Sequence, residues 1–399
     1  MLESSSHLDL GQTMDLYHFQ DEAPGAVFWH PHGYAMIRRL ESLIRQWMER
    51  EGFQEVRTPQ ILAQSIWEKS DHWDKNRPKF YKIVERDRTL GIKPVSCPGH
   101  IQVVRRLAPG EDDLPIRLSE FGICHENDPG GDPEGLFRLC QFTVDDGHVF
   151  CREDQVLGEV AKFARSLFDF YSALGFHEIQ VVLATRPPAR VGDDATWDRA
   201  EAVLAEAGRA AGLRVETEPG QGAFYGPRLD FTLKDHQGRW WMCGTIQLDF
   251  LLPKRFELRY ADAGRNLHAM VMLHRAMVGS LERFLGLVLE QCAGELPAWL
   301  APEQVLVAAL GESARCRAEM ALRELREAGL RGRMLVCEDP EARPSPPLGV
   351  PWMLVFEPER TVRGTIRVRR RNRPDLVLEP DAVVPWMCAQ AEWPTPPPR

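Results

Sequence analysis

The sequence has no apolar run of the about 18–20 residues that a helix needs to cross a bilayer. Its first residues, Met1 to Asp9, are polar and lack the apolar segment of a secretory signal peptide. No internal repeat is visible along the chain. These absences argue against a membrane-spanning protein, an exported protein and a repeat architecture.

The chain also lacks a net positive charge and a regular spacing of cysteines. The net charge is −9 at pH 7, so the chain as a whole is not a basic nucleic-acid binder, and any RNA contact needs a local basic patch. The nine cysteines are odd in number and scattered without a tight spacing pattern. That usage is typical of a reduced, cytoplasmic protein and not of a disulfide scaffold. We therefore expect a cytoplasmic protein with no membrane partner.

What is present indicates a globular protein of more than one domain. Apolar residues make up 44% and charged residues 27% of the 399 positions, a length that exceeds what one core usually holds. A domain boundary is predicted near Pro297–Pro302, where prolines flank a short apolar stretch. The expected divisions are a polar leader over 1–22, a large domain over 23–300, a small domain over 303–390 and a Pro-rich tail over 391–399.

The spacing of apolar residues predicts the secondary structure. In the large domain the expected elements are a helix from Gly33 to Gly52, a strand over 53–56, helices over 153–174 and 194–211, strands over 179–185 and within 231–250, and a strand leading into a helix over 267–290. In the small domain they are strands over 304–310, 333–337, 352–356 and 365–368 and a helix over 314–328. Strands dominate the centre of the large domain, which favours an α+β fold with an antiparallel sheet.

Three residues form a candidate metal site: Cys97, His148 and His274. Zinc accepts one thiolate and two imidazoles and keeps a fourth position open for substrate or water. The residues are far apart in the sequence, so no local spacing rule for zinc covers them. Taken singly, each histidine is more typical of a hydrogen-bonded position in the core than of a metal ligand.

The motif over 119–131, Ser-Glu-Phe-Gly-Ile-Cys-His-Glu-Asn-Asp-Pro-Gly-Gly, resembles the second signature motif of class II aminoacyl-tRNA synthetases. Residues from about Leu16 to Leu300 resemble the catalytic core of the threonyl-tRNA synthetase family. The matching stretches are 23–30, 67–69, 97–100, 142–148, 185–187, 197–201, 222–227, 243–250 and 274–284. The resemblance implies a class II core with an antiparallel sheet of six or seven strands flanked by helices, followed by a small α/β anticodon-binding-like domain. It also implies a homodimer.

The resemblance further implies a threonine pocket. Zinc held by Cys97, His148 and His274 would bind the amino and hydroxyl groups of threonine, Asp146 would accept a hydrogen bond from that hydroxyl, and the pocket would include Tyr225 and Gln247. The physical reason for a metal is discrimination. Valine and threonine are nearly isosteric, so an apolar pocket separates them poorly, whereas a cation that demands an oxygen ligand rejects valine.

The part of the motif that the resemblance assigns to ATP and Mg²⁺ is altered. Arg283 and Arg138 match residues that contact the triphosphate, and Asp128 matches the acid that contacts adenine. Glu126, however, stands where the family has the arginine for the α-phosphate, and a carboxylate there repels phosphate. Further departures are Cys140, Val144 and Met242. Threonine activation is therefore expected to be weak or absent unless another cation compensates. Glu126 and Asp128 are alternatively a Mg²⁺ or acceptor-amine site, or two solvated acids.

The flanking regions also differ from the family pattern. The editing domains are expected to be absent, and the anticodon-binding domain is expected to be shortened, with the Pro-rich segment 340–347 in place of a helix. The basic run over 363–373 is either an RNA contact or a solvated strand face. The expected function is activation of threonine as an adenylate for transfer to tRNA, to a carrier protein or to a small amine. The alternative is a non-catalytic threonine-binding protein.

Overall fold

The computed structural model describes residues 6–75, 80–127, 134–235, 237–357 and 365–394. The chain forms two compact units, one of residues 1–18, 28–40 and 287–394 and the other of residues 19–27, 41–286 and 395–399. Within the described ranges, none of the helices has the length and apolar character that crossing a bilayer demands. All nine cysteines lie in these ranges and carry free thiols.

The elements of the larger unit run from the C-terminal half of helix α2 to the N-terminal half of helix α9, since each of these two helices is divided between the units. The helices are α2 (Pro31–Arg50), α3 (Gln64–Lys69), α4 (His72–Lys75), α5 (Cys97–Leu107), α6 (Val156–Ala173), α7 (Asp194–Ala210), α8 (Leu251–Arg255) and α9 (Leu281–Gln291). The strands are β3 (Gln54–Glu55), β4 (Ile61–Ala63), β5 (Lys82–Glu85), β6 (Arg88–Ile92), β7 (Ile116–His125), β8 (Gln141–Cys151), β9 (Ile179–Ala184), β10 (Val215–Glu218), β11 (Arg228–Lys234), β12 (Trp240–Asp249), β13 (Arg259–Ala261), β14 (Leu267–Ala269) and β15 (Val271–Ser280).

The main sheet of this unit has eight strands in the order β10-β9-β11-β12-β15-β8-β7-β3. Its interior pairs are antiparallel as expected, but the two edge pairs, β10 with β9 and β3 with β7, are parallel. The expectation of six or seven antiparallel strands was therefore wrong at the edges. Parallel neighbours need a crossover connection, and helix α7 supplies it between β9 and β10.

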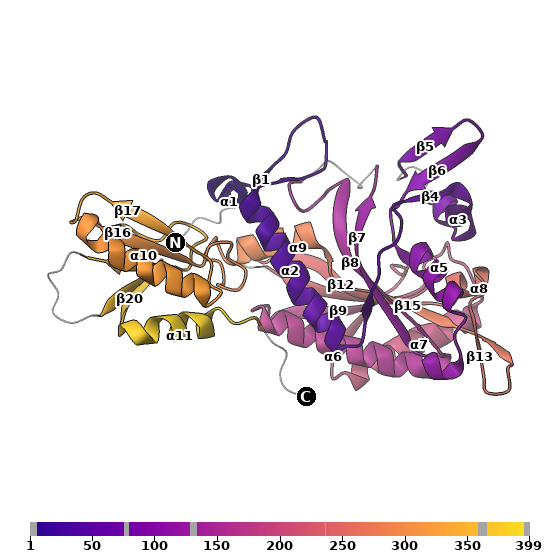
Figure 1. Ribbon diagram of the computed structural model, residues 1–399. Helices are drawn as coiled ribbons and strands as arrows, with labels where there is room; N and C mark the ends of the chain where they lie inside the picture. Colours follow the sequence, from indigo (N-terminus) through magenta and orange to yellow (C-terminus); the bar gives the residue numbers. More distant parts are fainter. Residues whose placement is uncertain (1–5, 76–79, 128–133, 236, 358–364, 395–399) are drawn as a thin grey trace. The chain divides into compact units, whose positions relative to one another are not determined.

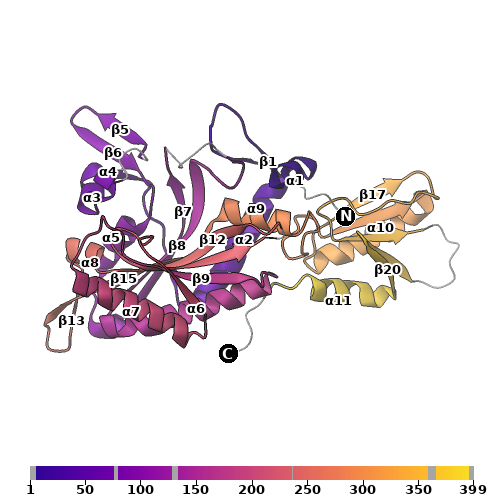
Figure 2. The same cartoon turned by 180° about the vertical axis from the view of Figure 1, so that it is seen from behind.

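Helices cover one face of this sheet and leave the opposite face for the site. Helices α6 and α7 pack against each other and against strands β9 to β12 and β15 (Figures 1 and 2). The guanidinium of Arg275 lies over the ring of Phe163 on α6, which places Arg275 on the helix-covered face. Successive side chains of a strand point to opposite faces. The neighbouring His274 therefore points to the other face, away from α6.

The end of strand β15 is held by one buried carboxylate. Asp145 is fully buried and accepts hydrogen bonds from the backbone N–H groups of Met277, Val278 and Gly279 at 2.5, 3.0 and 2.8 Å. These bonds span a break in the pairing of β15 with β8 between Ala276 and Ser280, where ladder partners are lost. The carboxylate thus replaces the missing strand as the acceptor.

We predict that Asp145→Asn lowers the free energy of unfolding by about 2–3 kcal/mol, because the new NH₂ group faces buried amide donors. Urea unfolding followed by tryptophan fluorescence measures this change. The control is Asp112→Asn, an exposed position in the short 3-10 helix Glu111–Asp113, which is expected to shift stability by less than about 0.5 kcal/mol. Equal urea midpoints for Asp145→Asn and the unmodified chain would contradict the prediction.

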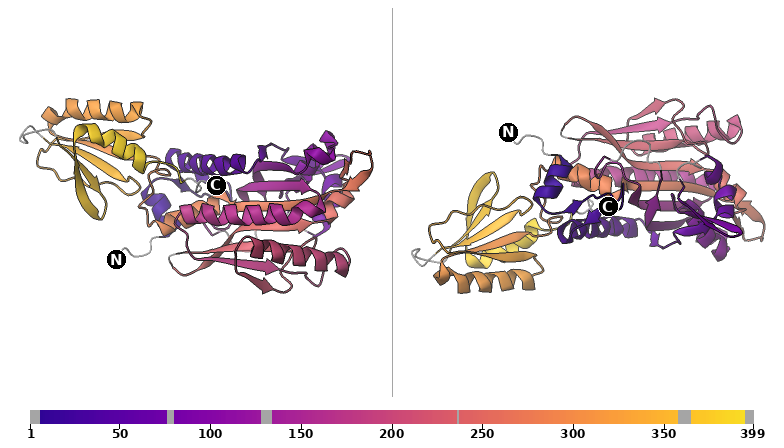
Figure 3. Two further views of the ribbon diagram at one scale, coloured as in Figure 1. Left: turned by 90° about the horizontal axis from the view of Figure 1, so that it is seen from below. Right: turned by 90° about the horizontal axis from the view of Figure 1, so that it is seen from above.

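The smaller unit is built on a five-stranded sheet in the order β17-β16-β18-β19-β20. Its elements are α1 (His7–Thr13), β1 (Tyr17–His18), β2 (Phe28–Trp29), β16 (Val305–Leu310), α10 (Glu312–Glu327), β17 (Gly332–Cys337), β18 (Trp352–Phe356), β19 (Ile366–Arg370), β20 (Arg373–Leu378) and α11 (Pro380–Gln390). Helices α10 and α11 lie on the same face of the sheet (Figure 3), and their buried residues share one core with alternate residues of β16. The other face of β16 has a second core without a helix.

The Pro-rich segment 340–347 contains no helix, as the sequence predicts, and it packs on that second face through Ala342. Part of the basic run serves this packing. Arg369 and Arg371 donate to the carbonyls of Pro344 and Pro346 at 2.5 and 3.4 Å. Arg363, at the start of the run, lies outside the described residues. At least two of its arginines therefore have internal partners that an RNA phosphate would have to displace.

The expected leader includes helix α1. Ser6 and Asp9 form a capping box at its N-terminus, which satisfies backbone donors that a helix leaves open. The buried His7 donates from its backbone to Glu290 at 3.0 Å, and its ring Nδ1 lies 2.8 Å from the same carboxylate oxygen.

Candidate active site

Strand pairing brings the two candidate histidine ligands together. His148 on β8 lies directly opposite His274 on β15, and Gln247 on β12 lies opposite His274 on the other side. Side chains at paired positions lie about 4.5–5.5 Å apart at Cβ and on the same face of the sheet. The three residues therefore form one row across the sheet, although they are distant in the sequence.

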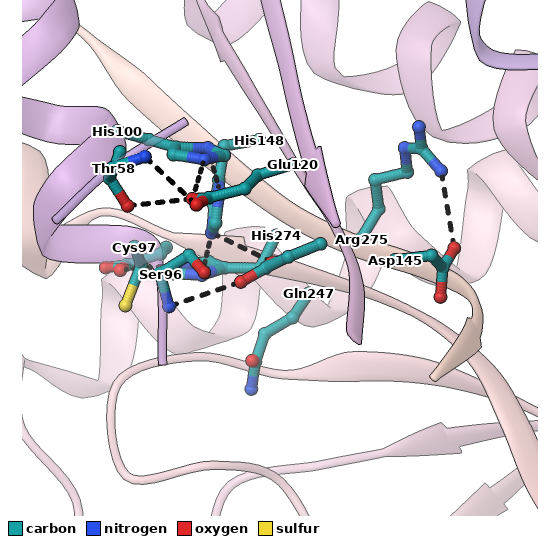
Figure 4. A network of polar contacts seen from close by, with 12 residues as sticks. Thr58, Ser96, Cys97, His100, Glu120, Asp145, His148, Gln247, His274 and Arg275 are labelled. Atoms are coloured by element: carbon teal, nitrogen blue, oxygen red, sulfur yellow. Dashed lines mark hydrogen bonds and ion pairs between the residues drawn. The ribbon is translucent and has the colours of Figure 1, made fainter. Parts of the chain in front are cut away.

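Helix α5 completes the cluster from outside the sheet. Cys97 is the first residue of α5, and its Sγ and one nitrogen each of His148 and His274 lie within 4.8 Å of one another. All three side chains are buried. Figure 4 shows them converging, with His148 Nε2 3.1 Å from His274 Nδ1. Two nitrogens bound to one tetrahedral zinc at about 2.0–2.1 Å lie about 3.3 Å apart, so this spacing fits a shared metal.

Burial sets the protonation of this cluster. Burial, with His100 and His274 nearby, lowers the pKa of His148 well below its ordinary value, so the ring is neutral, as a metal ligand must be. Burial, with Asp146 and Asp249 nearby, raises the pKa of the Cys97 thiol well above its ordinary value. A thiolate at this place requires a compensating cation. The donor set of one sulfur and two imidazoles therefore fits zinc.

Each histidine has a partner on its far side. His274 Nε2 lies 2.9 Å from Oδ2 of Asp249, whose other oxygen accepts from the backbone N–H groups of Leu251 and Leu252 at 2.6 and 3.0 Å. Asp249 is thus an acceptor, and His274 carries its proton on Nε2 and leaves Nδ1 bare. Asp249 was not among the residues predicted for the site. Its position two residues after Gln247 on one strand would have placed it on the same face.

The residues expected to form the threonine pocket lie beside this cluster. Asp146 accepts from the backbone N–H of Ser96 at 3.3 Å, and its other oxygen lies 3.7 Å from His148 Nε2. Tyr225 donates from its hydroxyl to Gln247 Oε1 at 2.9 Å, and its ring centroid is 5.3 Å from that of His274. Burial raises the pKa of the Tyr225 hydroxyl well above its ordinary value, so it stays a donor.

The residues assigned to ATP lie at the ends of strands β7 and β8 and at the start of α9. Glu126 follows β7, is half-buried, and donates its backbone N–H to the carbonyl of Cys140 at 2.8 Å. Arg283 on α9 donates from Nε to the carbonyl of Phe137 at 3.0 Å, next to Arg138 in the chain. The structure therefore connects Arg283 with the segment that carries Arg138.

Two further positions that depart from the family pattern lie on strands β8 and β12. Val144 lies on β8 opposite Gly122, and Met242 on β12 has 46% of its surface exposed. Asp128, the residue matched to adenine binding, lies outside the described residues.

Beyond the expected residues, the structure adds a buried polar network behind His148. His148 Nδ1 lies 2.8 Å from His100 Nδ1, and His100 Nε2 lies 3.2 Å from Glu120. Burial raises the pKa of Glu120, but hydrogen bonds from His100 and Thr58 and the charge of Lys93 outweigh it and lower that pKa to about 2. His100 stands three residues after Cys97, one helical turn away, and that spacing was the available signal.

The low pKa of Glu120 predicts how stability depends on pH. The pKa of an unfolded glutamate is near 4.5, so the carboxylate stabilises the fold fully above that pH and loses this contribution as the pH falls toward about 2. The loss amounts to about 3 kcal/mol. We expect urea unfolding of metal-free protein to weaken by this amount over that range. Glu120→Gln is expected to show a correspondingly flatter profile, and parallel profiles would contradict the assignment.

A comparison with known sequences supports the class. The family described as "tRNA synthetase class II core domain (G, H, P, S and T)" matches residues 81–292, which carry the metal cluster and the strands that form it. The fold and the site therefore define the core of a class II aminoacyl-tRNA synthetase.

More similar relatives narrow this class. A threonine--tRNA ligase of Methylobacillus flagellatus is 44% identical over 377 residues, 94% of this chain and 59% of that relative. Another from Polynucleobacter asymbioticus is 42% identical and matches 96% of this chain. The crystal structure of the RNA binding domain of threonyl-tRNA synthetase from Cryptosporidium parvum has a TM-score of 0.89 and 32% identity, and the match covers 97% of this chain and 98% of that one. The chain belongs to the threonyl-tRNA synthetase family.

The expected family and fold class are thus confirmed. A putative threonyl-tRNA synthetase from Aeropyrum pernix, at 23% identity and a TM-score of 0.83, shares the fold. The chain spans about six tenths of the length of the curated relatives that it matches.

Proposed function

We propose that this chain binds threonine at the Cys97–His148–His274 cluster and converts it to threonyl-adenylate with ATP and Mg²⁺. The observation that carries this proposal is the convergence of one thiol and two imidazoles within 4.8 Å, beside Asp146. When bound, zinc supplies a Lewis acid that holds the amino and hydroxyl groups of threonine.

The chain's own residues orient the amino acid. The backbone N–H of Ser96 holds Oδ2 of Asp146, which leaves the second carboxylate oxygen to accept the threonine hydroxyl proton. Tyr225 keeps Gln247 in place through the bond from its hydroxyl. Valine offers no proton to Asp146 and would leave that half-buried acceptor unpaired, so it is rejected more strongly than an apolar pocket would reject it.

The residues expected to contact ATP are only partly retained. Positions 283 and 138 retain the arginine that the family uses to contact the triphosphate. Glu126, however, places a carboxylate where the family has a phosphate-binding arginine. Losing one donor to a charge that develops at the reacting phosphorus reduces the rate by about 10²–10³-fold in other enzymes. We therefore propose slow activation.

The acceptor of the threonyl group is proposed to be tRNA, as the names of the relatives state for those proteins, or a carrier protein or small amine in a specialised pathway. The altered motif favours the second version, because a slow activating step is poorly suited to supplying protein synthesis. Efficient charging of tRNA with threonine by the purified chain would exclude the non-tRNA version.

Threonine-dependent ATP–pyrophosphate exchange tests the activity. Zinc-loaded protein is assayed with threonine, serine and valine at matched concentrations. Exchange with threonine alone supports the proposal and leaves the acceptor as the next question. Absence of exchange with all three, while calorimetry still detects threonine binding, rejects activation.

The second candidate is a non-catalytic threonine-binding protein. The specific observation in its favour is Glu126, since one reversed charge weakens ATP binding without touching the metal cluster. The same exchange assay decides between the two candidate functions.

We further propose that the chain forms a homodimer in a reducing, cytoplasmic compartment. Sedimentation of the purified chain tests the assembly, and fluorescence imaging of a tagged chain tests the location.

A further inference from the structure

A buried carboxylate network lies behind His148 and has no part in the proposed reaction. Glu120 on β7 and Lys93 are exposed by only 3% and 1% and form an ion pair at 3.0 Å. His100 in helix α5 is fully buried between Glu120 and His148. Burying charges is costly, so a network of this kind requires an account beyond packing. Figure 4 shows Glu120, His100 and His148 in sequence, leading to the metal cluster.

All four contacts of Glu120 come from donors or from a ring nitrogen. Oε1 accepts from the backbone N–H of Thr58 and from Lys93 Nζ, each at 3.0 Å. Oε2 accepts from Thr58 Oγ1 at 2.8 Å and lies 3.2 Å from His100 Nε2. An ionised carboxylate has no proton to give. His100 therefore carries a proton on Nε2.

The position of the proton on His100 determines which nitrogen of His148 carries a proton. A neutral His100 with its proton on Nε2 presents a bare Nδ1, which accepts a hydrogen bond. Nδ1 of His148, at 2.8 Å, must then carry the proton that fills this contact. The remaining nitrogen of His148, Nε2, is bare and faces Nδ1 of His274.

We infer that Glu120 and His100 are positioning residues of the metal site, which hold the His148 proton on Nδ1 and thereby present its Nε2 to the cation. The inference rests on the proposed metal site. The two histidine ligands are then held in the same way, because Asp249 holds the proton of His274 on Nε2 and leaves its Nδ1 to face the metal. Outer partners of this kind change metal affinity by about 10–100-fold in other metal sites.

Glu120→Gln is the sharpest variant because its amide cannot satisfy the same donors. One orientation places the NH₂ group against Lys93 Nζ and the Thr58 N–H, which are both donors. The other orientation places it at His100 Nε2, where it donates and moves the His100 proton to Nδ1. That proton would displace the one on His148 to Nε2, the nitrogen that faces the metal.

The experiment measures the Zn²⁺ dissociation constant of the full chain by competition with a chelator, at one fixed pH. We expect Glu120→Gln and His100→Leu to weaken Zn²⁺ binding about 10–100-fold. His100→Asn keeps an acceptor close to the position of Nδ1 and is expected to recover part of that loss. Co²⁺-substituted Glu120→Gln is expected to show altered d–d absorption bands, because one imidazole leaves the coordination sphere.

The matched control is Glu290→Gln. Glu290 is a carboxylate that is also buried, lies 2.8 Å from His7 Nδ1 and belongs to the smaller unit, so a general loss of stability would appear there without a change in metal affinity. Glu120→Gln and His100→Leu that bind Zn²⁺ within threefold of the unmodified chain would overturn the inference. If Glu120→Gln does not fold, the His100→Leu and His100→Asn pair decides. An unmodified chain that binds no Zn²⁺ would instead overturn the proposed function.

Discussion

Glu126→Arg is expected to raise the rate of threonine-dependent ATP–pyrophosphate exchange by about 100-fold. The substitution removes a carboxylate that repels the α-phosphate and supplies a planar guanidinium that donates two parallel hydrogen bonds to it. One well-placed donor to a developing charge is worth about 10²–10³ in rate. The backbone at this position is already fixed, since the N–H of residue 126 donates to the Cys140 carbonyl at 2.8 Å.

Glu126→Gln separates the two contributions to this gain. Glutamine removes the repulsive charge without adding the guanidinium, so its exchange rate is expected to lie between those of the unmodified chain and Glu126→Arg. Threonine affinity, measured by calorimetry without ATP, is expected to be the same in all three proteins. An unchanged exchange rate in Glu126→Arg would show that Cys140, Val144 and Met242 dominate the defect.

Cys97→Ala is expected to abolish stoichiometric zinc and to weaken threonine binding at least about 100-fold. Sulfur is one of only three protein ligands in the cluster, and structural zinc sites gain about 10–16 kcal/mol from their full ligand sets. Removing the thiol also leaves Asp146 and Asp249 near the cluster without a cation. Metal content by mass spectrometry and threonine titration by calorimetry measure the two effects.

The control for this variant is Cys124→Ala. Cys124 is 1% exposed on strand β7, so truncating it creates a similar cavity, but its sulfur is not among the three ligands of the cluster. It is expected to keep zinc and threonine binding while losing some stability. Zinc at one equivalent in Cys97→Ala would contradict the ligand assignment. Equal zinc loss in both variants would show that packing, and not ligation, retains the metal.

Local pattern was enough for several elements of the fold. The apolar repeat before Gly52 predicted helix α2, and the strand-like stretches within 231–250 predicted β11 and β12. Strand β10 was not predicted, because three of its four residues, Glu216 to Glu218, are polar and exposed. It exists because β9, the α7 crossover and the right-handed twist of the sheet place it beside an open edge.

The residues of the candidate site also fall into those that the sequence predicted and those that only the structure shows. Cys97, His148 and His274 carry chemistry that a motif can show, and the structure places their ligand atoms within 4.8 Å of one another. His100, Glu120 and Asp249 act through those ligands and carry no chemistry that a motif search ranks. Their importance depends on which atom faces which, and this is a property of three-dimensional contacts.

The sequence by itself determined the family, the class II core and the charge reversal at Glu126, because these depend only on which residue types occur in which order. Tertiary structure alone decided that His148 and His274 are direct cross-strand neighbours and that Arg275 points away from them. It also decided which nitrogen of each ring is bare. Strand register and side-chain contacts set these properties, and the contacts join residues 25 to 126 positions apart in the chain.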